Sequence, residues 1–464
     1  MEKKRGTFSG NIGFVMAAAG SAVGLGNIWR FPYLAARHGG GLFLITYIIL
    51  ALTFGFTILT TEIAIGRKTK QGPLTAYKKV HPKFGGIGII GWIVPIIILP
   101  YYCAIGGWVM KYMFTYITGG ATEAAGDKYF VGFITSQWPP IIWMLIFVAI
   151  TAIVVFCGVE KGIEKYSRVL MPILLVLIVA IAIFSLTLSS PDENGVERTG
   201  MEGLAVYVIP NLSDISFAEI RSVIMDAVGQ LFYSISVAMG IMIAYGSYVK
   251  DDTNMMKSIN QIEIFDTIVA ILAGVMIVPA VYVFMGTEGM SAGPGLMFES
   301  LPKVFDAMGP IGPFVGAIFF IMVLFAAVTS SVSIMEAIVS GFMDKWKFTR
   351  KKSTGLTVTY ALLIGLVVCL GYNIFYFDAI LPTTPPGKSA QILDIMDYVS
   401  NSLLMPVVSL ATCILIGWVV KPQYVIAEVT KNNEKFGRKG LFILMVKYIA
   451  PVFFLLMILQ AFGL

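Results

Sequence analysis

One interruption in an apolar segment near the N-terminus constrains the fold most. Residues 12–36 are largely apolar, but residues 20–32 read GSAVGLGNIWRFP. Three glycines, Asn27, Arg30 and Pro32 all oppose a regular helix there. Within a bilayer, unpaired backbone groups are tolerated only where they line a cavity or are buried in protein. The stretch therefore predicts an ion and substrate site built from unwound backbone; the alternative is a glycine-rich helix-packing face.

Composition predicts a polytopic membrane protein. Of the 464 residues, 57% are hydrophobic and 13% are charged, and the mean hydropathy is +0.83, whereas soluble domains carry about 25% charged residues. A helix needs about 20 apolar residues to cross a bilayer. Eleven segments meet this need, at 11–36, 41–66, 87–117, 140–157, 166–188, 224–249, 259–286, 311–341, 356–373, 391–420 and 442–463.

The basic residues predict the orientation in the cell membrane. Most of the 33 Lys and Arg residues lie in the N-terminus and in the loops after even-numbered spans. By the positive-inside rule, the N-terminus is cytoplasmic and the C-terminus, after an odd number of spans, is outside. The net charge of +6 reflects this bias and does not indicate nucleic-acid binding. A cleaved signal peptide ending near Ala19 is rejected, because it would break the charge alternation.

No enzyme signature accompanies these spans. The four cysteines are scattered, one to a predicted span, without a CxxC pair, so they read as packing residues. His38 and His81 fall in loops and form no cluster. The sequence lacks a hydrolase triad, a phosphate-binding loop and a redox motif, so the chain is not expected to be an enzyme.

Spans one to five and six to ten form two halves, and the second is inverted because each half holds an odd number of spans. Such a repeat predicts an interruption in the sixth span to match that in the first. Residues 226–248 read DAVGQLFYSISVAMGIMIAYGSY, with glycine, glutamine and serine crowding the middle. A serine-rich continuous helix, its hydroxyls bonded to its own carbonyls, is the alternative. The predicted division is 1–10, 11–188 (first repeat), 189–223 (extracellular loop), 224–420 (second repeat), 421–441 (cytoplasmic loop) and 442–464 (eleventh helix).

Four motifs together resemble the neurotransmitter:sodium symporter family. They are GSAVGLGNIWRFP, the pair Tyr101–Tyr102, GQLFYSIS and AAVTSS, and the resemblance extends from Arg5 to the last span. The chain is most similar to the bacterial amino-acid members with eleven spans. The fold that this resemblance implies is an all-α membrane protein: an inverted five-plus-five helix repeat with unwound first and sixth helices, plus an eleventh helix.

The resemblance implies two sodium ions. The first site would use the Ala22 carbonyl, Asn27, Ser234 and Asp266, and the substrate carboxylate would complete it. The second site would use Gly20, Val23, Ala326, Thr329 and Ser330.

Asp266 departs from the asparagine frequent in the family, and a buried carboxylate could replace the chloride that some relatives bind. Chloride-independent transport is therefore expected. Alternatively, Asp266 lies at the cytoplasmic entrance of its helix, near Lys257, as a cap-like residue.

The resemblance also implies a substrate pocket and two gates. Amides near Leu25 and Gly26, together with Tyr102, would bind the carboxylate of the substrate. Carbonyls of the sixth span would accept hydrogen bonds from its ammonium group. The pocket would comprise Ser21, Ala22, Leu25, Gly26, Ile98, Tyr102, Tyr233, Ser234, Ser236, Met239, Ser330 and Ile334. The extracellular gate would comprise Arg30, Gln230, Tyr233 and Asp397, with Tyr102 beside it, and the cytoplasmic gate Arg5, Phe8, Tyr248 and Asp344.

The sequence is thus interpreted as a sodium-coupled symporter that carries an amino acid, hydrophobic or aromatic, into the cell by alternating access. The expected partners are the substrate and the lipid bilayer, and the expected assembly is a monomer or weak dimer. A proton-coupled permease of related fold is an alternative, although the neutral hydroxyls of Thr329 and Ser330 favour sodium. A substrate-gated channel or receptor is a further alternative. The paired gates disfavour a channel, and the lack of a recognisable soluble signalling domain disfavours a receptor.

Overall fold

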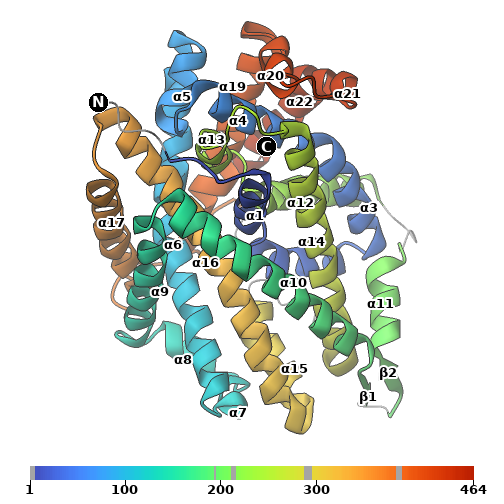
Figure 1. Cartoon of the computed structure of the whole chain (residues 1–464). Coiled ribbons are helices and arrows are strands. Elements are labelled where there is room, and N and C mark those ends of the chain that lie inside the picture. Colours follow the sequence, from blue (N-terminus) through green and yellow to red (C-terminus); the bar gives the residue numbers. More distant parts are fainter. Residues whose placement is uncertain (1–5, 193–194, 211–215, 287–294, 383–388, 464) are drawn as a thin grey trace.

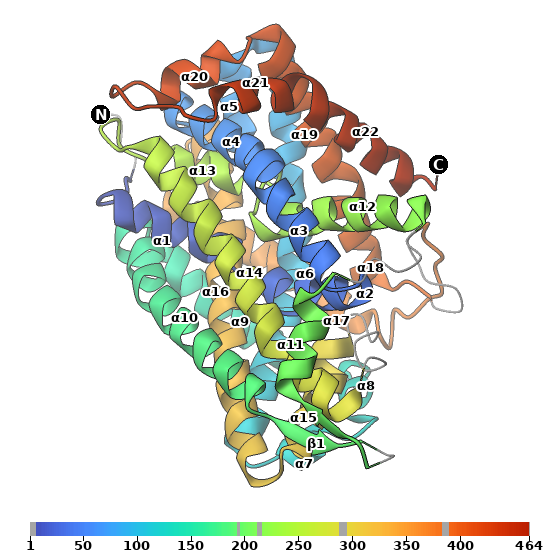
Figure 2. The same cartoon turned by 90° about the vertical axis from the view of Figure 1, so that its right-hand side faces the viewer.

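A computed structural model shows a helical bundle (Figures 1 and 2). It describes residues 6–192, 195–210, 216–286, 295–382 and 389–463. Within these ranges the only strands are β1 (Ser189–Pro191) and β2 (Glu197–Thr199), which form an antiparallel hairpin. Helices account for nearly all the remaining regular structure, which confirms the predicted all-α class.

Nine described helices are long and apolar enough to cross a membrane, and a bent pair makes a tenth. The bent pair is α1 (Asn11–Ala22) and the segment Gly26–Arg37, which ends in α2 (Phe31–Arg37), with 53° between them. The continuous helices are Gly41–Thr69 (containing α3, Gly41–Leu50, and α4, Phe56–Thr69), Pro82–Ile117 (α6, Gly85–Ile117), α9 (Pro139–Phe156), Val159–Leu186 (α10, Lys165–Leu186), α14 (Met255–Met285), Gly309–Trp346 (α16, Gly312–Trp346), α17 (Arg350–Leu370), Ile392–Val419 (α18, Ile392–Asp397, and α19, Met405–Ile414) and Lys439–Ala461 (α21, Lys439–Leu444, and α22, Ala450–Ala461).

The sixth span is divided into α12 (Phe217–Ser234) and α13 (Ile241–Gly246). Between them, Ser236, Ala238 and Gly240 take positive φ angles of 53°, 63° and 73°. Non-glycine residues adopt this conformation only under constraint from their surroundings. Here the Glu62 carboxylate of α4 accepts a hydrogen bond of 2.7 Å from the Ala238 amide. The predicted interruptions in the first and sixth spans are therefore confirmed.

Helix starts differ from their predicted positions where a polar side chain caps the first turn. The helix α12 begins before residue 224, because Ser216 and Glu219 form a reciprocal capping box. The helix α17 likewise begins before residue 356, since the Thr349 hydroxyl accepts from the Lys352 amide.

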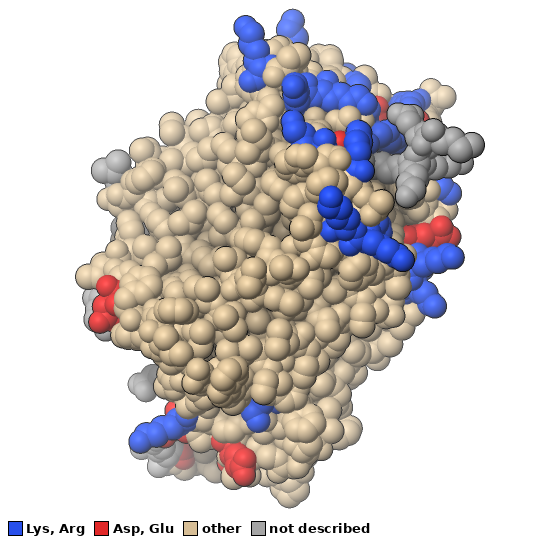
Figure 3. All heavy atoms as spheres, turned by 90° about the vertical axis from the view of Figure 1, so that its left-hand side faces the viewer, with Lys and Arg blue, Asp and Glu red and all other residues tan. Residues whose placement is uncertain are grey.

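Short helices lie at the two ends of the bundle. One end, called the basic end below, carries α5 (Pro73–Val80), α20 (Gln423–Val429) and α21 (Figures 1 and 2). Figure 3 shows Lys and Arg gathered toward this end, above a broad surface with few charges. The opposite end carries the β1–β2 hairpin and the helices α7 (Ala121–Ala124), α8 (Tyr129–Ile134), α11 (Gly200–Val208) and α15 (Leu301–Ala307).

Candidate functional site

The breaks in the first and sixth spans contact each other inside the bundle. The Gln230 side chain donates to the Gly26 carbonyl at 3.0 Å, and the Ser236 hydroxyl donates to the Ser21 carbonyl at 2.8 Å. Side chains of the sixth span thus supply partners for carbonyls at the break in the first span. Gly26 must be a glycine here, because a Cβ atom would lie 2.3 Å from the Tyr233 ring.

A fully buried carboxylate lies beside both breaks. Asp266 Oδ1 is 2.8 Å from Asn27 Nδ2 and 2.7 Å from Ser234 Oγ, and Asn27 Nδ2 also donates to Ser234 Oγ at 2.9 Å. Asp266 lies well inside α14 with 0% exposure, not at the helix entrance that the alternative interpretation requires. Three residues predicted for the first sodium site are therefore mutually bonded, and Ala22, also buried, ends α1.

Tyr47 of α3 belongs to the same cluster, although the sequence analysis missed it. Its hydroxyl lies 3.1 Å from Ser234 Oγ and 3.3 Å from Asp266 Oδ2. The sequence feature that could have pointed to Tyr47 is its hydroxyl group, which is a polar group inside the apolar run GLFLITYIIL. Glu62 was missed in the same way; one of its oxygens bonds Ala238, and the other has no hydrogen-bond partner among the described residues.

A second group of oxygen atoms lies where α1 meets α16. Thr329 Oγ1 is 3.1 Å from the Ala326 carbonyl, and the Ser330 hydroxyl donates to the Ser21 carbonyl at 3.1 Å. A Cβ atom on Gly20 would lie 3.4 Å from Thr329 Cβ, so the two helices touch there. Val23, buried and extended (ψ 96°), directly follows α1. Gly20, Thr329 and Ser330, predicted for the second sodium site, thus lie at one helix contact. Val23, directly after α1, and Ala326, one turn before Ser330 in α16, are their neighbours in the chain.

A small cavity lies next to both groups. It is walled by Ser21, Gly24, Leu25, Ile98, Tyr102, Tyr233, Ser236, Met239, Ser330 and Ile334. All except Gly24 were predicted; Ala22, Gly26 and Ser234 were predicted but do not line the wall. Gly24 is needed because a Cβ atom there would lie 2.7 Å from Ser330 Oγ.

The wall of the cavity includes the Tyr102 hydroxyl. It is buried and faces the Ser330 hydroxyl and the Leu25 backbone without a well-formed hydrogen bond to either. An unsatisfied buried hydroxyl destabilises a fold by about 1–3 kcal/mol. The Tyr102 hydroxyl is therefore suited to donate a hydrogen bond to a bound ligand.

A larger hollow, with about 750 Å³ of space, adjoins the cavity. Arg30, Tyr233 and Asp397 line it, and Tyr233 also lines the cavity, so its ring separates the two spaces. The Arg30 guanidinium carbon lies 5.9 Å from the centre of that ring. Asp397 accepts hydrogen bonds from Tyr101 and Asn401, and no ion pair within 4.0 Å joins it to Arg30 among the described residues. Three predicted outer-gate residues therefore surround the hollow, and Gln230 is bonded to Gly26 beneath them.

On the side of the cavity nearer the basic end, the chain is closely packed. The Phe8 ring contacts Tyr245 and Tyr248 with ring centres 5.7 and 6.3 Å apart. The Tyr248 hydroxyl donates to Glu336, which also pairs with Arg350 at 2.6 Å. Of the predicted inner-gate residues, Phe8 and Tyr248 are in contact. Asp344 accepts from the Gly72 amide at 2.5 Å, and Arg5 lies outside the described residues.

His38 is paired rather than isolated in a loop. Its Nε2 lies 2.6 Å from Asp226 Oδ2 of α12, and its ring stacks on Phe43 of α3. The pair joins the outer halves of the two broken spans, which sequence spacing alone does not reveal. Cys157 also departs from expectation, since it is exposed while Cys103, Cys369 and Cys413 are buried. Within the described ranges, no three His, Cys, Asp or Glu residues are grouped as metal ligands.

Comparison with known proteins gives consistent matches along the whole chain. The model of the sodium:neurotransmitter symporter family matches residues 5–128 and 134–463. The uncharacterized sodium-dependent transporter YhdH of Bacillus subtilis is 32% identical over 470 residues, covering 100% of this chain and 99% of that protein. The sodium- and chloride-dependent GABA transporter 2 of Macaca fascicularis is 27% identical, covering 81% of this chain and 68% of that protein.

A solved structure matches the fold closely. The crystal structure of MhsT in complex with L-phenylalanine superposes with a TM-score of 0.85 at 34% sequence identity, and the match covers 98% of this chain and 100% of MhsT.

Proposed function

Because the chain belongs to the sodium:neurotransmitter symporter family, we propose that it is a sodium-coupled symporter that carries a hydrophobic or aromatic amino acid into the cell. The observation that carries this proposal is the position of the cavity. It lies at the two helix breaks, next to both groups of oxygen atoms, and the Tyr102 hydroxyl in its wall makes no well-formed hydrogen bond to the protein. Such breaks present unpaired amides and carbonyls to charged ligands.

A zwitterion satisfies both ends of the cavity. Its carboxylate would accept from the Tyr102 hydroxyl and from amides near Leu25 and Gly26. Its ammonium would donate to carbonyls of the sixth span near Tyr233 and Ser236. This arrangement leaves the side chain of an α-amino acid pointing into the remaining wall.

That remaining wall favours an apolar side chain. Ile98, Met239 and Ile334 supply most of it, and methionine adapts its shape to different occupants. The bound L-phenylalanine of MhsT, a relative at 34% identity, supports an aromatic or other hydrophobic substrate.

Sodium would bind as a second substrate at two places. The first is formed by Asn27, Ser234 and Asp266 with the Ala22 carbonyl, and the Asn27 amide would turn its oxygen toward the ion in place of its nitrogen. The second is formed by Gly20, Val23, Ala326, Thr329 and Ser330. Since the substrate carboxylate would complete the first site, ion and amino acid would bind cooperatively.

The two sides of the cavity support transport by alternating access. Tyr233 lines both the cavity and the outer hollow, whereas Phe8, Tyr248 and Glu336 pack densely on the side nearer the basic end. Binding would bring Arg30 and Asp397 together above Tyr233 and then loosen the inner contacts.

The basic end would lie in the cytoplasm of a cell-membrane protein, with the N-terminus inside and the C-terminus outside. We further propose that transport is chloride-independent, because Asp266 supplies a fixed negative charge beside the first ion. A monomer or weak dimer would suffice, since one chain holds the complete site.

Uptake by purified protein in liposomes tests the proposal. An inward sodium gradient should drive accumulation of phenylalanine, leucine or tryptophan, and an equal potassium gradient should not. A thermal-shift screen of the twenty amino acids would first identify the substrate, which should stabilise the protein only when sodium is present. Accumulation that is indifferent to exchanging sodium for potassium would refute sodium coupling.

A further inference from the structure

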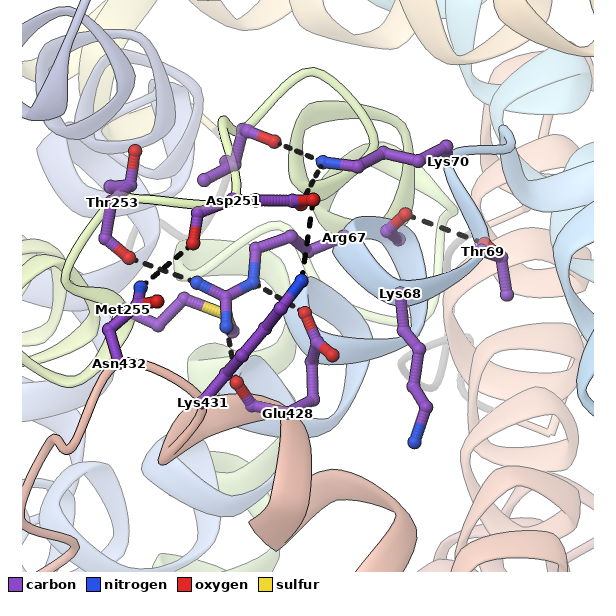
Figure 4. Close-up of polar contacts among 12 residues, drawn as sticks. Arg67, Lys68, Thr69, Lys70, Asp251, Thr253, Met255, Glu428, Lys431 and Asn432 are labelled. Atoms are coloured by element: carbon purple, nitrogen blue, oxygen red, sulfur yellow. Dashed lines mark hydrogen bonds and ion pairs between the residues drawn. The ribbon is translucent and has the colours of Figure 1, made fainter.

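The segment that joins the tenth span to the eleventh lies across the basic ends of other spans. This segment, residues 423–438, consists of α20 and the chain that follows it, and is called the strap below. Figures 1 and 2 show α20 beside the end of α4, and Figure 4 shows the polar contacts between them. Four separate sets of contacts fasten the strap to α4, to the loop 249–254 and to α14.

The first set centres on a fully buried arginine. Arg67, near the end of α4, has 0% exposure, and its Nε lies 2.6 Å from Glu428 Oε1. The same guanidinium donates to the Glu428 carbonyl and, at 2.9 Å, to the Thr253 carbonyl (Figure 4). One side chain therefore binds α4 to the strap and to the loop after α13.

The second set surrounds Asp251 of that loop. Its carboxylate pairs with Lys70 at 2.8 Å and with Lys431 at 3.3 Å, while its carbonyl accepts from Asn432 at 2.8 Å. The hydrogen bond from Lys70 holds the pKa of Asp251 below its ordinary value, so the carboxylate is charged at neutral pH. These groups are half-exposed, so they orient the strap more than they stabilise it.

The third set caps a helix. Glu434 of the strap accepts from the amides of Met255 and Met256 at 3.2 and 3.1 Å. These amides begin α14 and have no partner inside the helix, and a carboxylate there also interacts favourably with the helix dipole.

The fourth set lies at the far end of the strap. Arg438 binds both oxygens of Glu263 of α14, at 2.9 and 2.6 Å. The same arginine reaches Asn260 at 2.6 Å and the Leu52 carbonyl at 2.9 Å, and it lies 3.5 Å from the centre of the Phe56 ring. Its planar, delocalised charge suits this combination of a bidentate pair and a stacked ring.

Contacts of this strength do not part in every transport cycle. Separating Arg67 from Glu428 would leave a buried charge without a partner, which is far more costly than separating an exposed pair. By contrast, the α13–α16 contact, with Tyr245 bonded to Ser333 at 2.6 Å, joins a half-helix of the broken span to a continuous one. Motion at the basic end is therefore expected between α13 and α16, not between the strap and the ends that it joins.

We propose that the strap fastens the basic ends of α4, the loop 249–254 and α14 into one rigid body, and that this body moves as a unit when the inner side opens. The proposal rests on the transport function proposed above. Arg67 and Arg438 are then positioning residues, which act on transport through the segments that they hold together.

Cysteine bridges in the full chain test the proposal. The background is Cys157→Ser, which removes the exposed cysteine. Asp251→Cys with Asn432→Cys would place a bridge within the proposed body. Tyr245→Cys with Ser333→Cys, joined by a reducible bifunctional thiol reagent about as long as a tyrosine side chain, would place one across the α13–α16 contact, because only the tip of the Tyr245 side chain reaches Ser333. The bridge within the body should leave uptake within twofold of the reduced protein. The bridge across α13–α16 should lower uptake at least tenfold, reversibly on reduction.

Two results would overturn the proposal. One is a reversible loss of uptake of tenfold or more when 251 and 432 are bridged; the other is full uptake when 245 and 333 are bridged. Failure of the unbridged background to accumulate any amino acid would instead contradict the transport function.

Hydrogen exchange supplies a readout that does not depend on uptake. Arg438→Gln should raise amide exchange in residues 249–256 as well as in the strap, and Arg438→Lys should restore part of the protection. Lys435→Gln, an exposed strap position without an ion pair among the described residues, is the matched control. Faster exchange confined to the strap in Arg438→Gln would contradict a single rigid body.

Discussion

The Oδ1 atom of Asp266 lies 2.8 Å from the side-chain nitrogen of Asn27, and this contact joins the middle of α14 to the break in the first span. Both residues are completely buried. A carboxylate removed from water is stable only when it is paired, hydrogen-bonded or bound to a cation. The contact thus places an anionic group where sodium would have to bind, next to the substrate cavity.

Replacement of Asp266 by Asn should lower sodium-driven uptake at least tenfold or make it depend on chloride. The reason is that the variant lacks the fixed charge that balances the first ion. Uptake should be measured with chloride or gluconate as the anion, and Asp252→Asn, in an exposed loop, is the control. If the Asp266 variant took up substrate at the wild-type rate both with and without chloride, the assignment would be disproved.

Tyr102→Phe should weaken substrate binding about tenfold, equivalent to about 1.4 kcal/mol, without lowering the melting temperature. The hydroxyl makes no well-formed hydrogen bond to the protein, so its removal should weaken ligand binding more than folding stability. Tyr112→Phe is the matched control, because the Tyr112 hydroxyl donates to the Phe298 carbonyl at 2.8 Å. The control should lose stability and keep its affinity, as measured by ligand binding and thermal unfolding. The reverse pattern would show that the cavity is not the substrate site.

Gly26→Ala should lower uptake at least tenfold, because the added methyl group would overlap the Tyr233 ring that separates the cavity from the outer hollow. The ring would have to leave its position and could not close over a substrate. Gly355→Ala, in a helix where a Cβ atom meets nothing within 4 Å, should transport normally. Normal uptake by the Gly26 variant would argue against a role for Tyr233 as the lid.

Thr329→Val should raise the sodium concentration for half-maximal uptake several-fold, since it removes one oxygen from the second ion site at nearly constant volume. Ser331→Ala is the control; its hydroxyl bonds the Val328 carbonyl and Thr151, away from α1. Sodium titrations of uptake at saturating substrate compare the two. An unchanged sodium requirement in the Thr329 variant would exclude this residue as a ligand.

The interruptions in the first and sixth spans could be predicted because their cause is local. Glycine, proline and polar residues weaken a helix wherever they occur. Within a membrane, the resulting unpaired backbone is tolerated only where it lines a cavity or is buried in protein. Asp266 could be singled out for the same reason, since a lone carboxylate in an apolar segment requires a partner.

The partners of these groups could not be predicted in the same way. Tyr47 contacts Asp266, Glu62 supports Ala238, and His38 pairs with Asp226, all across large separations in the chain. Tyr47 and Glu62 stand out as polar groups in an apolar span, but nothing in the local sequence says which distant group each of them contacts. The strap likewise reads as a polar loop until Arg67 is seen buried against Glu428.

The sequence by itself therefore determined which backbone segments would lack internal hydrogen bonds and which side chains would need a counterpart. Those requirements follow from the free energy of removing polar groups from water, which depends on residue type. Only the tertiary structure decided which group meets each requirement. That choice depends on how entire helices pack together, and packing is a property of the whole chain, not of any one segment.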